Sequence, residues 1–145
     1  MMNAIGQGAG LVFQIDVLIT IFLSAIFGLV QGGINHKVVR ARAPIAHEPT
    51  SRTGLRHVDG TVSMARNAPG TAMGDFFITV GPAAYLDARE GSAGYSAFGK
   101  VVSGMEVIRG ILAGKTHPGG WSENTKGQSL VAPVRIISAR RVPQG

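Results

Sequence analysis

The side chains capable of covalent or metal chemistry are few in this sequence, and their spacing matches no known kind of catalytic or metal site. The histidines are scattered along the chain, at His36, His47, His57 and His117. Histidines that bind a metal normally recur within a few residues of one another or combine with cysteines, and the chain has no cysteine. That absence also excludes disulfides and thiolate chemistry. The sequence therefore predicts no metal ion and no cofactor.

The glycine-rich stretches do not form a phosphate-binding loop either. Residues 6–10 read Gly-Gln-Gly-Ala-Gly, but no lysine follows at the spacing that such a loop requires. Gly114-Lys115-Thr116 has the right ending, yet the earlier glycine that it needs falls at Arg109. The segment also closes an expected helix, whereas a phosphate loop opens one. Neither stretch indicates nucleotide binding.

The most informative part of the chain is residues 60–108, where short runs of small, aromatic and glycine residues follow one another. These runs are Met64-Ala65-Arg66, Gly74-Asp75-Phe76-Phe77-Ile78, Tyr85-Leu86-Asp87, Phe98-Gly99-Lys100-Val101-Val102 and Gly104-Met105-Glu106-Val107. Upstream stands Gln31-Gly32-Gly33. In order and approximate spacing, these elements resemble the substrate-binding half of the cyclophilins, a family of peptidyl-prolyl cis-trans isomerases. The resemblance covers residues 29–113 well and does not extend to residues 1–28.

The resemblance implies an enzyme that rotates X-Pro bonds in proline-containing polypeptides and so assists protein folding. The barrier to this rotation is about 18–20 kcal/mol, because the amide resonance has to be broken. A catalyst needs an apolar pocket for the proline ring, hydrogen bonds to the flanking peptide, and a donor near the prolyl nitrogen. It needs no nucleophile, metal or cofactor. The alternative that we keep open is a non-catalytic module that binds proline peptides.

The resemblance also implies a set of residues that line the pocket. Gln31 matches the catalytic-site glutamine that bonds the substrate backbone and orients the family's catalytic arginine. Phe77 matches the aromatic floor of the proline pocket. Met64 and Leu86 match its apolar lining, and Leu29 stands where the family usually has methionine.

A second set of residues matches the part of the site that holds the extended peptide. Ala65, Arg66 and Asn67 correspond to the segment that pairs with the peptide backbone. Tyr95 stands where many relatives have histidine and bacterial ones often have tyrosine. Asp75 replaces a glutamine of the usual Gln-Phe-Phe run, and an ionised carboxylate accepts hydrogen bonds but donates none.

Two further departures concern the active site directly. Gly28 aligns with a phenylalanine of the proline pocket, so part of the apolar wall is missing. The family's catalytic arginine aligns near Leu23, and the first arginine of this chain is Arg40. The resemblance therefore predicts reduced isomerase activity for the chain as given.

The charge of the chain gives no sign of a nucleic-acid site. The formal net charge is +6, with 14 Lys and Arg against 8 Asp and Glu. The basic residues are spread along the sequence without a block of like charges, whereas a nucleic-acid footprint is usually clustered on one face. We expect a solvated basic surface and no nucleic-acid partner, while the oligomeric state is left open.

The N-terminal segment, residues 1–28, is apolar and allows three interpretations. The run from Leu11 to Val30 is about long enough to cross a membrane, but it contains Asp16 and has no basic residue before it. It is either buried core structure, with a strand near Val12 and a helix over residues 17–27, or a membrane anchor, or an incomplete start. Localisation is correspondingly open between the cytoplasm and a periplasmic or membrane-anchored site.

The remaining elements must position the site residues. Alternation and turn residues predict strands over residues 61–65, 76–80, 95–102 and 134–142. Helical spacing predicts one helix over residues 104–113, and residues 34–58 lack a period and indicate a long loop. We predict a mainly β fold, a cyclophilin-like antiparallel β-barrel with one or two helices, formed by residues 29–145 after the atypical segment 1–28.

Overall fold

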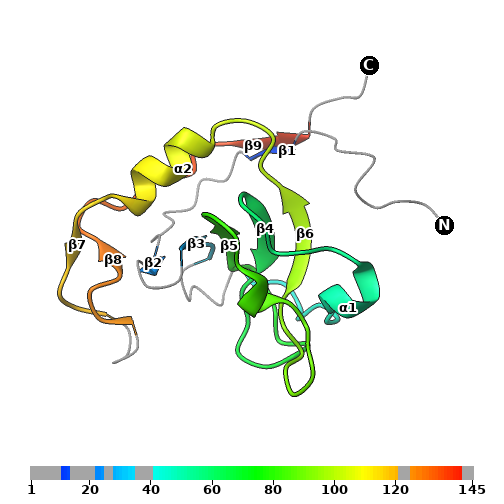
Figure 1. Cartoon of the computed structure of the whole chain (residues 1–145). Helices are drawn as coiled ribbons and strands as arrows, with labels where there is room; N and C mark the ends of the chain where they lie inside the picture. Colours follow the sequence, from blue (N-terminus) through cyan, green and yellow to red (C-terminus); the bar gives the residue numbers. More distant parts are fainter. Residues whose placement is uncertain (1–10, 14–21, 25–27, 35–40, 121–124, 142–145) are drawn as a thin grey trace.

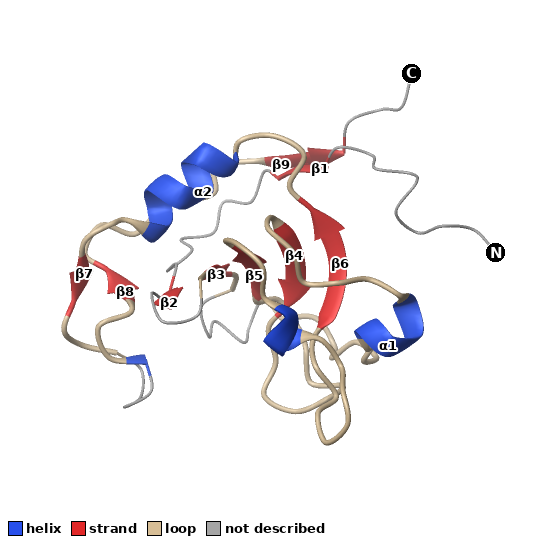
Figure 2. Ribbon diagram, viewed as in Figure 1, coloured by secondary structure: helices blue, strands red, loops and turns tan. Residues whose placement is uncertain are grey.

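The computed structural model describes residues 11–13, 22–24, 28–34, 41–120 and 125–141. In these residues the chain is built mainly of strands, with two α-helices and a short 3-10 helix (Figures 1 and 2). The strands are β1 (Leu11–Phe13), β2 (Phe22–Ser24), β3 (Leu29–Gly32), β4 (Thr61–Met64), β5 (Phe76–Thr79), β6 (Ser96–Lys100), β7 (Thr116–His117), β8 (Ser129–Leu130) and β9 (Ala139–Arg141). The helices are α1 (Thr50–Thr53), η2 (Ala84–Leu86) and α2 (Met105–Leu112).

All described strand pairs are antiparallel, as predicted. Seven strands form one sheet in the order β6-β4-β5-β3-β2-β8-β7, and β1 pairs with β9 in a separate two-stranded sheet. Among the described residues no pairing joins β6 to β7, so the sheet has an open order and the closed barrel is not confirmed. The architecture is nevertheless the mainly antiparallel β structure expected of a cyclophilin fold.

The register of the three central strands decides which side chains share a face. Gln31 of β3 lies directly opposite Phe77 of β5, which lies opposite Ser63 of β4. Directly paired residues point to the same side of an antiparallel sheet, so these three form one row. Val30 and Met64, one position along, belong to the other face, because successive side chains alternate. The sheet therefore has a Phe77 face and a Val30 face.

Helix α2 covers the Val30 face (Figure 1). Its residues Ile108, Ile111 and Leu112 recur at helical spacing and pack against the cluster of Val30 and Leu130. The prediction of a helix over residues 104–113 is thus confirmed to within one residue at each end. This layer holds the back of the sheet and leaves the Phe77 face to the loops.

Most of the predicted strands are present but shorter. Strands β4, β5 and β6 lie within the predicted ranges 61–65, 76–80 and 95–102. The predicted terminal strand 134–142 is reduced to Ala139–Arg141, since Val134 and Ile136 pack against the Val30 cluster instead. The predicted loop 34–58 contains the short helix α1.

The N-terminal apolar segment contributes strands where it is described. Residues 22–24 form β2, so a continuous helix over residues 17–27 is wrong, while most of that range lies outside the described residues. The helices in the described part of the chain are all too short or too polar to cross a membrane.

Two glycines in the turn after η2 differ in how closely the neighbouring backbone approaches them. Gly94 has φ +61° and is buried, and a Cβ atom there would overlap the backbone of Asp87 and Ala88. Gly91 has a similar φ of +74°, but a Cβ atom there meets nothing within 4 Å. We predict that Gly94→Ala lowers the free energy of unfolding by about 2–4 kcal/mol, from backbone strain plus overlap.

Gly91→Ala is the matched control, because Gly91 has a left-handed backbone but no close neighbour. This substitution should lower the free energy of unfolding by about 1–2 kcal/mol. Urea denaturation of both variants measures the difference. Equal losses would show that the approach of Gly94 to residues 87–88 is not a constraint on folding.

Candidate functional site

The centre of the candidate site is Phe77, on the face of the sheet that α2 does not cover. This residue is 3% exposed and forms a cluster with Ala83 and Leu86 from the turn that contains η2. Leu29 of β3, Ala65 after β4 and Tyr95 before β6 pack against this cluster and are half-buried. Elements far apart in sequence thus meet on one apolar centre with a partly exposed edge.

Tyr95 stands edge-on to Phe77 within the cluster. The two ring centroids are 5.3 Å apart and the interplanar angle is 86°, which is a favourable geometry for aromatic pairs. The amide of Tyr95 also donates to the carbonyl of Leu86 at 3.0 Å. Phe77, Leu86 and Tyr95 are therefore fixed relative to one another by both packing and backbone bonding.

Gln31 and Arg66 lie on opposite sides of Phe77. Gln31 is half-buried on β3, directly across from Phe77. Arg66 follows β4 on the other side, and its guanidinium carbon lies 4.7 Å from the centre of the Tyr95 ring. The arginine donates to the carbonyl of Gly94, while its Nε is buried without a hydrogen-bond partner among the described residues.

The segment after β4 is held against the segment before β5. The amide of Ala65 donates to the carbonyl of Asp75 at 2.9 Å, which extends the β4–β5 pairing by one bond. Asn67 is exposed, and its carbonyl accepts a bond from Arg66 at 3.4 Å. Asp75 is half-buried. These residues form the rim that leads from the Phe77 cluster to the surface.

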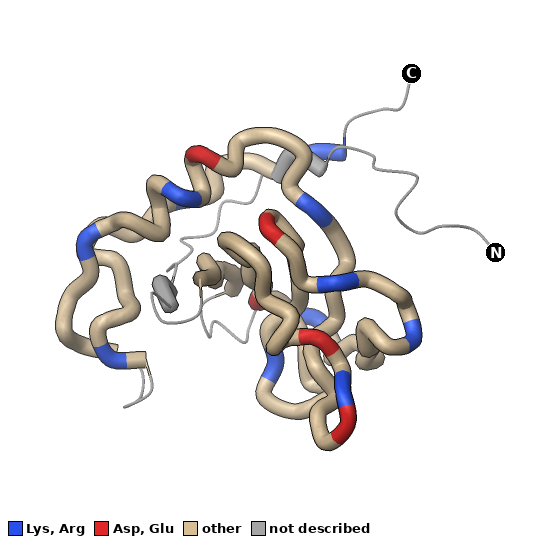
Figure 3. Tube along the Cα trace, viewed as in Figure 1, with Lys and Arg blue, Asp and Glu red and all other residues tan. Residues whose placement is uncertain are grey.

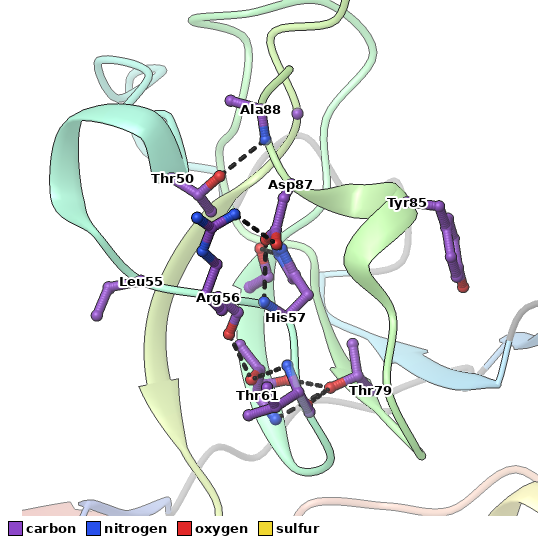
Figure 4. A network of polar contacts seen from close by, with 12 residues as sticks. Thr50, Leu55, Arg56, His57, Thr61, Thr79, Tyr85, Asp87 and Ala88 are labelled. Atoms are coloured by element: carbon purple, nitrogen blue, oxygen red, sulfur yellow. Dashed lines mark hydrogen bonds and ion pairs between the residues drawn. The ribbon is translucent and has the colours of Figure 1, made fainter.

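A buried polar network lies beneath the cluster (Figure 4). The Nδ1 atom of His57 lies 2.7 Å from Oδ1 of Asp87, and the amide of His57 donates to the same oxygen at 3.0 Å. The Nε2 atom of His57 lies 3.0 Å from the hydroxyl of Ser63. Arg56 adds a cation 3.5 Å from the other carboxylate oxygen of Asp87. Each polar group of this buried set is paired, as burial requires.

The network sets the ionisation of Asp87. Burial raises the pKa of this carboxyl, but the hydrogen bonds from the ring and amide of His57, with Arg56 beside them, act in the opposite direction. The stabilising contacts outweigh burial, and the pKa of Asp87 lies below its ordinary value. Asp87 is therefore a buried carboxylate at neutral pH.

The structure brings together most of the residues predicted for the site. Leu29, Ala65, Phe77, Leu86 and Tyr95 share the cluster, and the rim and flanking positions hold Gln31, Arg66, Asn67 and Asp75. Met64 is not brought to Phe77. It lies opposite Phe76, so its Cβ belongs to the face that carries Val30.

Sequence reasoning missed His57 and Ala83. His57 was one of several scattered histidines without ligand spacing, and its partner Asp87 is 30 residues away. Only the pairing of β4 with β5 and the return of the chain through η2 bring the two together. No local signal in the sequence indicates that contact.

Other features of the described residues lie apart from this cluster. In the described ranges no group of three or more His, Asp or Glu residues is placed to hold a metal ion. Figure 3 shows Lys and Arg distributed along the chain rather than gathered in one place. An open apolar depression of about 380 Å³ lies between α2 and β8, lined among others by Val107, Ile111 and Leu130. None of its lining residues belongs to the Phe77 cluster.

Comparison with known proteins shows the family of this chain. The family model of the cyclophilin type peptidyl-prolyl cis-trans isomerase/CLD matches residues 20–141. A peptidyl-prolyl cis-trans isomerase of Acinetobacter baylyi is 38% identical over 116 residues, which cover 77% of this chain and 58% of that protein. Peptidyl-prolyl cis-trans isomerase A of Dickeya dadantii is 38% identical over 117 residues, or 77% of this chain and 60% of that protein.

A shorter match has a higher identity. Peptidyl-prolyl cis-trans isomerase-like 3 of Gallus gallus is 46% identical over 55 residues, which is 37% of this chain and 31% of that protein. The chain therefore belongs to the cyclophilin type peptidyl-prolyl cis-trans isomerase family. It spans 58–60% of the length of the two bacterial relatives.

The lowered pKa of Asp87 predicts how stability changes in acid. Because the folded pKa lies below the unfolded value of about 3.9, the unfolded state binds more protons in this window, and stability rises with pH there. The contribution of Asp87 is complete above the unfolded pKa and is lost as pH falls through the folded pKa. We predict that wild type exceeds Asp87→Asn by about 1–3 kcal/mol above pH 5, and that this difference shrinks as the pH falls toward 2.

Urea denaturation of both proteins at a series of pH values measures this difference. Glu90→Gln, at an exposed position, controls for the removal of one negative charge from the chain. A wild-type advantage that is independent of pH would contradict the ionic role of Asp87.

Proposed function

We propose that this chain binds extended, proline-containing polypeptides at the Phe77 cluster and rotates their X-Pro bonds, as a peptidyl-prolyl cis-trans isomerase that assists protein folding. The observation that carries the proposal is the row of Gln31 beside Phe77, with Leu29, Leu86 and Tyr95 around the ring. The proline ring would lie against the apolar side chains, and the flanking peptide would lie along the rim at Ala65, Arg66 and Asn67.

The chemistry of the reaction suits such a site. Uncatalysed rotation takes tens of seconds or longer, because amide resonance raises the barrier. A site that holds the proline and the flanking peptide in a twisted geometry and bonds the prolyl nitrogen as its lone pair localises lowers that barrier. The Phe77 cluster supports the apolar part of this requirement, and Gln31 and Arg66 are adjacent hydrogen-bonding groups. Gln31 would bond the substrate backbone.

The family's catalytic arginine, the expected partner of Gln31, has no match at the expected position in this sequence. The register sets Phe22 opposite Gln31 and Leu23 opposite Val30, so the strand expected to carry the family's arginine is the neighbour of β3. Neither position is an arginine. Among the described arginines, Arg66 lies in contact with the cluster, through Tyr95. It is the candidate to replace part of the missing charge.

Two finer features of the fold belong to the same proposal. We propose that the sheet is part of a cyclophilin-like barrel, supported by its antiparallel order and by the family match to residues 20–141. We also propose that the isomerase unit comprises residues 29–145, with residues 1–28 as an atypical apolar segment.

The proposed function leads to a prediction about peptide binding. Phe77→Ala should weaken binding by about 1.5–3 kcal/mol, because the ring provides the apolar contact with proline. Asp75→Asn should cost only about 0.5–1.5 kcal/mol, since a rim carboxylate contributes one or two exposed hydrogen bonds. Titration of a proline-containing peptide into each protein, followed by calorimetry, gives the order of the two losses.

Phe77 is also a core residue, so its replacement lowers stability. Phe77→Leu preserves most of the buried volume and is the matched variant that we expect to fold. Circular dichroism of each sample shows that the measured protein is folded. Equal losses of affinity for Phe77→Leu and Asp75→Asn, or no loss for either, would place the peptide elsewhere.

A further prediction concerns the rate of isomerisation. The chain as given should isomerise a prolyl peptide about a hundred- to a thousand-fold more slowly than its bacterial relatives, because one preorganised donor near the prolyl nitrogen is missing. Phe22→Arg or Leu23→Arg should recover part of the rate, according to which side chain reaches Gln31. Arg66→Ala should reduce the residual activity further. A protease-coupled or NMR exchange assay measures all of these rates.

If the activity equals that of the relatives and none of these substitutions changes it, the missing arginine does not limit the rate. Peptide binding without measurable rotation in every variant would instead identify the chain as a non-catalytic proline-peptide module.

A further inference from the structure

His57 is the largest fully buried side chain in the described part of the chain. Its residue exposure is 1%, and both ring nitrogens have partners, Asp87 at 2.7 Å and Ser63 at 3.0 Å. An ionised carboxylate only accepts hydrogen bonds, so Nδ1 of His57 carries a hydrogen toward Asp87. The hydroxyl of Ser63 can donate to Nε2 or accept from it. The plane of the imidazole is therefore fixed from two sides.

The fixed imidazole lies against the ring at the centre of the candidate site. The centroids of His57 and Phe77 are 6.0 Å apart, and the two rings are inclined by 21°, which is a stacked arrangement. Offset stacking at this distance is favourable and directional. Tyr95 meets Phe77 edge-on, so the phenylalanine ring is held between one stacked and one perpendicular aromatic neighbour.

His57 also fixes the turn that carries Leu86. The carbonyl of His57 accepts a hydrogen bond from the amide of Ala83 at 2.9 Å. Its amide and ring both bond Asp87, the residue that follows Leu86. His57 thus contacts both Phe77 and the turn that carries Leu86.

We propose that His57 is a positioning residue for the peptide site. Asp87 and Ser63 hold the imidazole of His57 in place, and the imidazole in turn keeps the Phe77 ring stacked against it. The bonds of His57 to the following turn fix Leu86 beside the two rings. The inference rests on the proposed function, because it assigns His57 a role in peptide binding at that site. The imidazole itself does not touch the peptide, since it is fully enclosed and both nitrogens are engaged. It acts only by fixing Phe77 and Leu86.

Few charged or titratable groups lie next to the stacked rings of His57 and Phe77 in the described residues. Asp87 faces the imidazole from the turn after η2, and Arg56 lies against the outer oxygen of that carboxylate. Ser63 faces it from β4, and Tyr95 reaches it only through Phe77. Protonation of Asp87 therefore removes the negative acceptor that orients the imidazole. Positioning should weaken in acid.

Three variants test the proposal. His57→Asn retains a side-chain donor toward Asp87 but removes the ring that stacks on Phe77. Asp87→Asn retains a neutral oxygen acceptor and removes the charge. Leu130→Ala is the matched control, because it empties part of the core on the other face of the sheet and lowers stability without touching the Phe77 cluster.

The measurements are the dissociation constant of a proline-containing peptide and the NMR signals of the Phe77 ring, in samples shown to be folded. We expect His57→Asn to raise the dissociation constant of the peptide by roughly three- to tenfold. The same variant should shift and broaden the NMR signals of the Phe77 ring. In the isomerase assay it should raise KM more than it lowers kcat. Asp87→Asn should show at neutral pH the weaker affinity that wild type shows in acid, and should lose the acid dependence of wild type. Leu130→Ala should leave affinity and ring signals unchanged.

A purely structural role gives a different result. If His57→Asn and Leu130→Ala lower the unfolding midpoint alike while the peptide affinity and the Phe77 signals of both stay at wild-type values, the positioning role is overturned. Failure of wild type to bind the peptide, with ring signals still dependent on His57, would overturn the proposed function itself. The two failures are therefore distinguishable.

Discussion

The pairing of β5 between β3 and β4 is the constraint on which the candidate site depends. This register sets Gln31, Phe77 and Ser63 in one row across the sheet. A slip of one residue in either pairing would turn Phe77 toward α2 and bring Phe76 to the other face. The two-residue period of the strands and the apolar cluster on each face oppose such a slip. The layer of α2 on the Val30 face and the loops on the Phe77 face follow from the same register.

The second constraint is the burial of charge beneath an apolar cluster. A buried carboxylate is costly unless it is paired and hydrogen-bonded. Asp87 is paired by the imidazole and amide of His57 and by Arg56, and it stands directly after Leu86. The turn that supplies an apolar wall to the site is thus held by a polar anchor. The hydrogen bonds of Asp87 fix the orientation of the turn, whereas the apolar packing of Leu86 and Ala83 alone would not.

Sequence patterns predicted the strands β4, β5 and β6 and the helix α2, because each follows a local alternation or a helical spacing that the core then uses. The resemblance predicted Phe77, Leu86 and the side chains that pack against them, and most of these residues meet around Phe77, whereas Ala83 was not predicted. Met64 was expected beside Phe77, but its register position opposite Phe76 is a property of strand pairing that its own neighbours in sequence do not reveal. The His57–Asp87 contact was not predictable for the same reason, since it joins residues 30 positions apart. The short terminal strand differs from the prediction because Val134 and Ile136 contribute to the core with α2 rather than to a long ladder.

The most direct test of the account is to map where a proline-containing peptide binds. Amide NMR spectra of the chain, recorded during titration with such a peptide, report the residues whose surroundings change. The account predicts shifts concentrated at Gln31, at residues 65–67, and at Leu86 and Tyr95. Shifts concentrated instead at Ile111, Leu130 and the rest of the depression beside α2, with the Phe77 cluster unaffected, would contradict it.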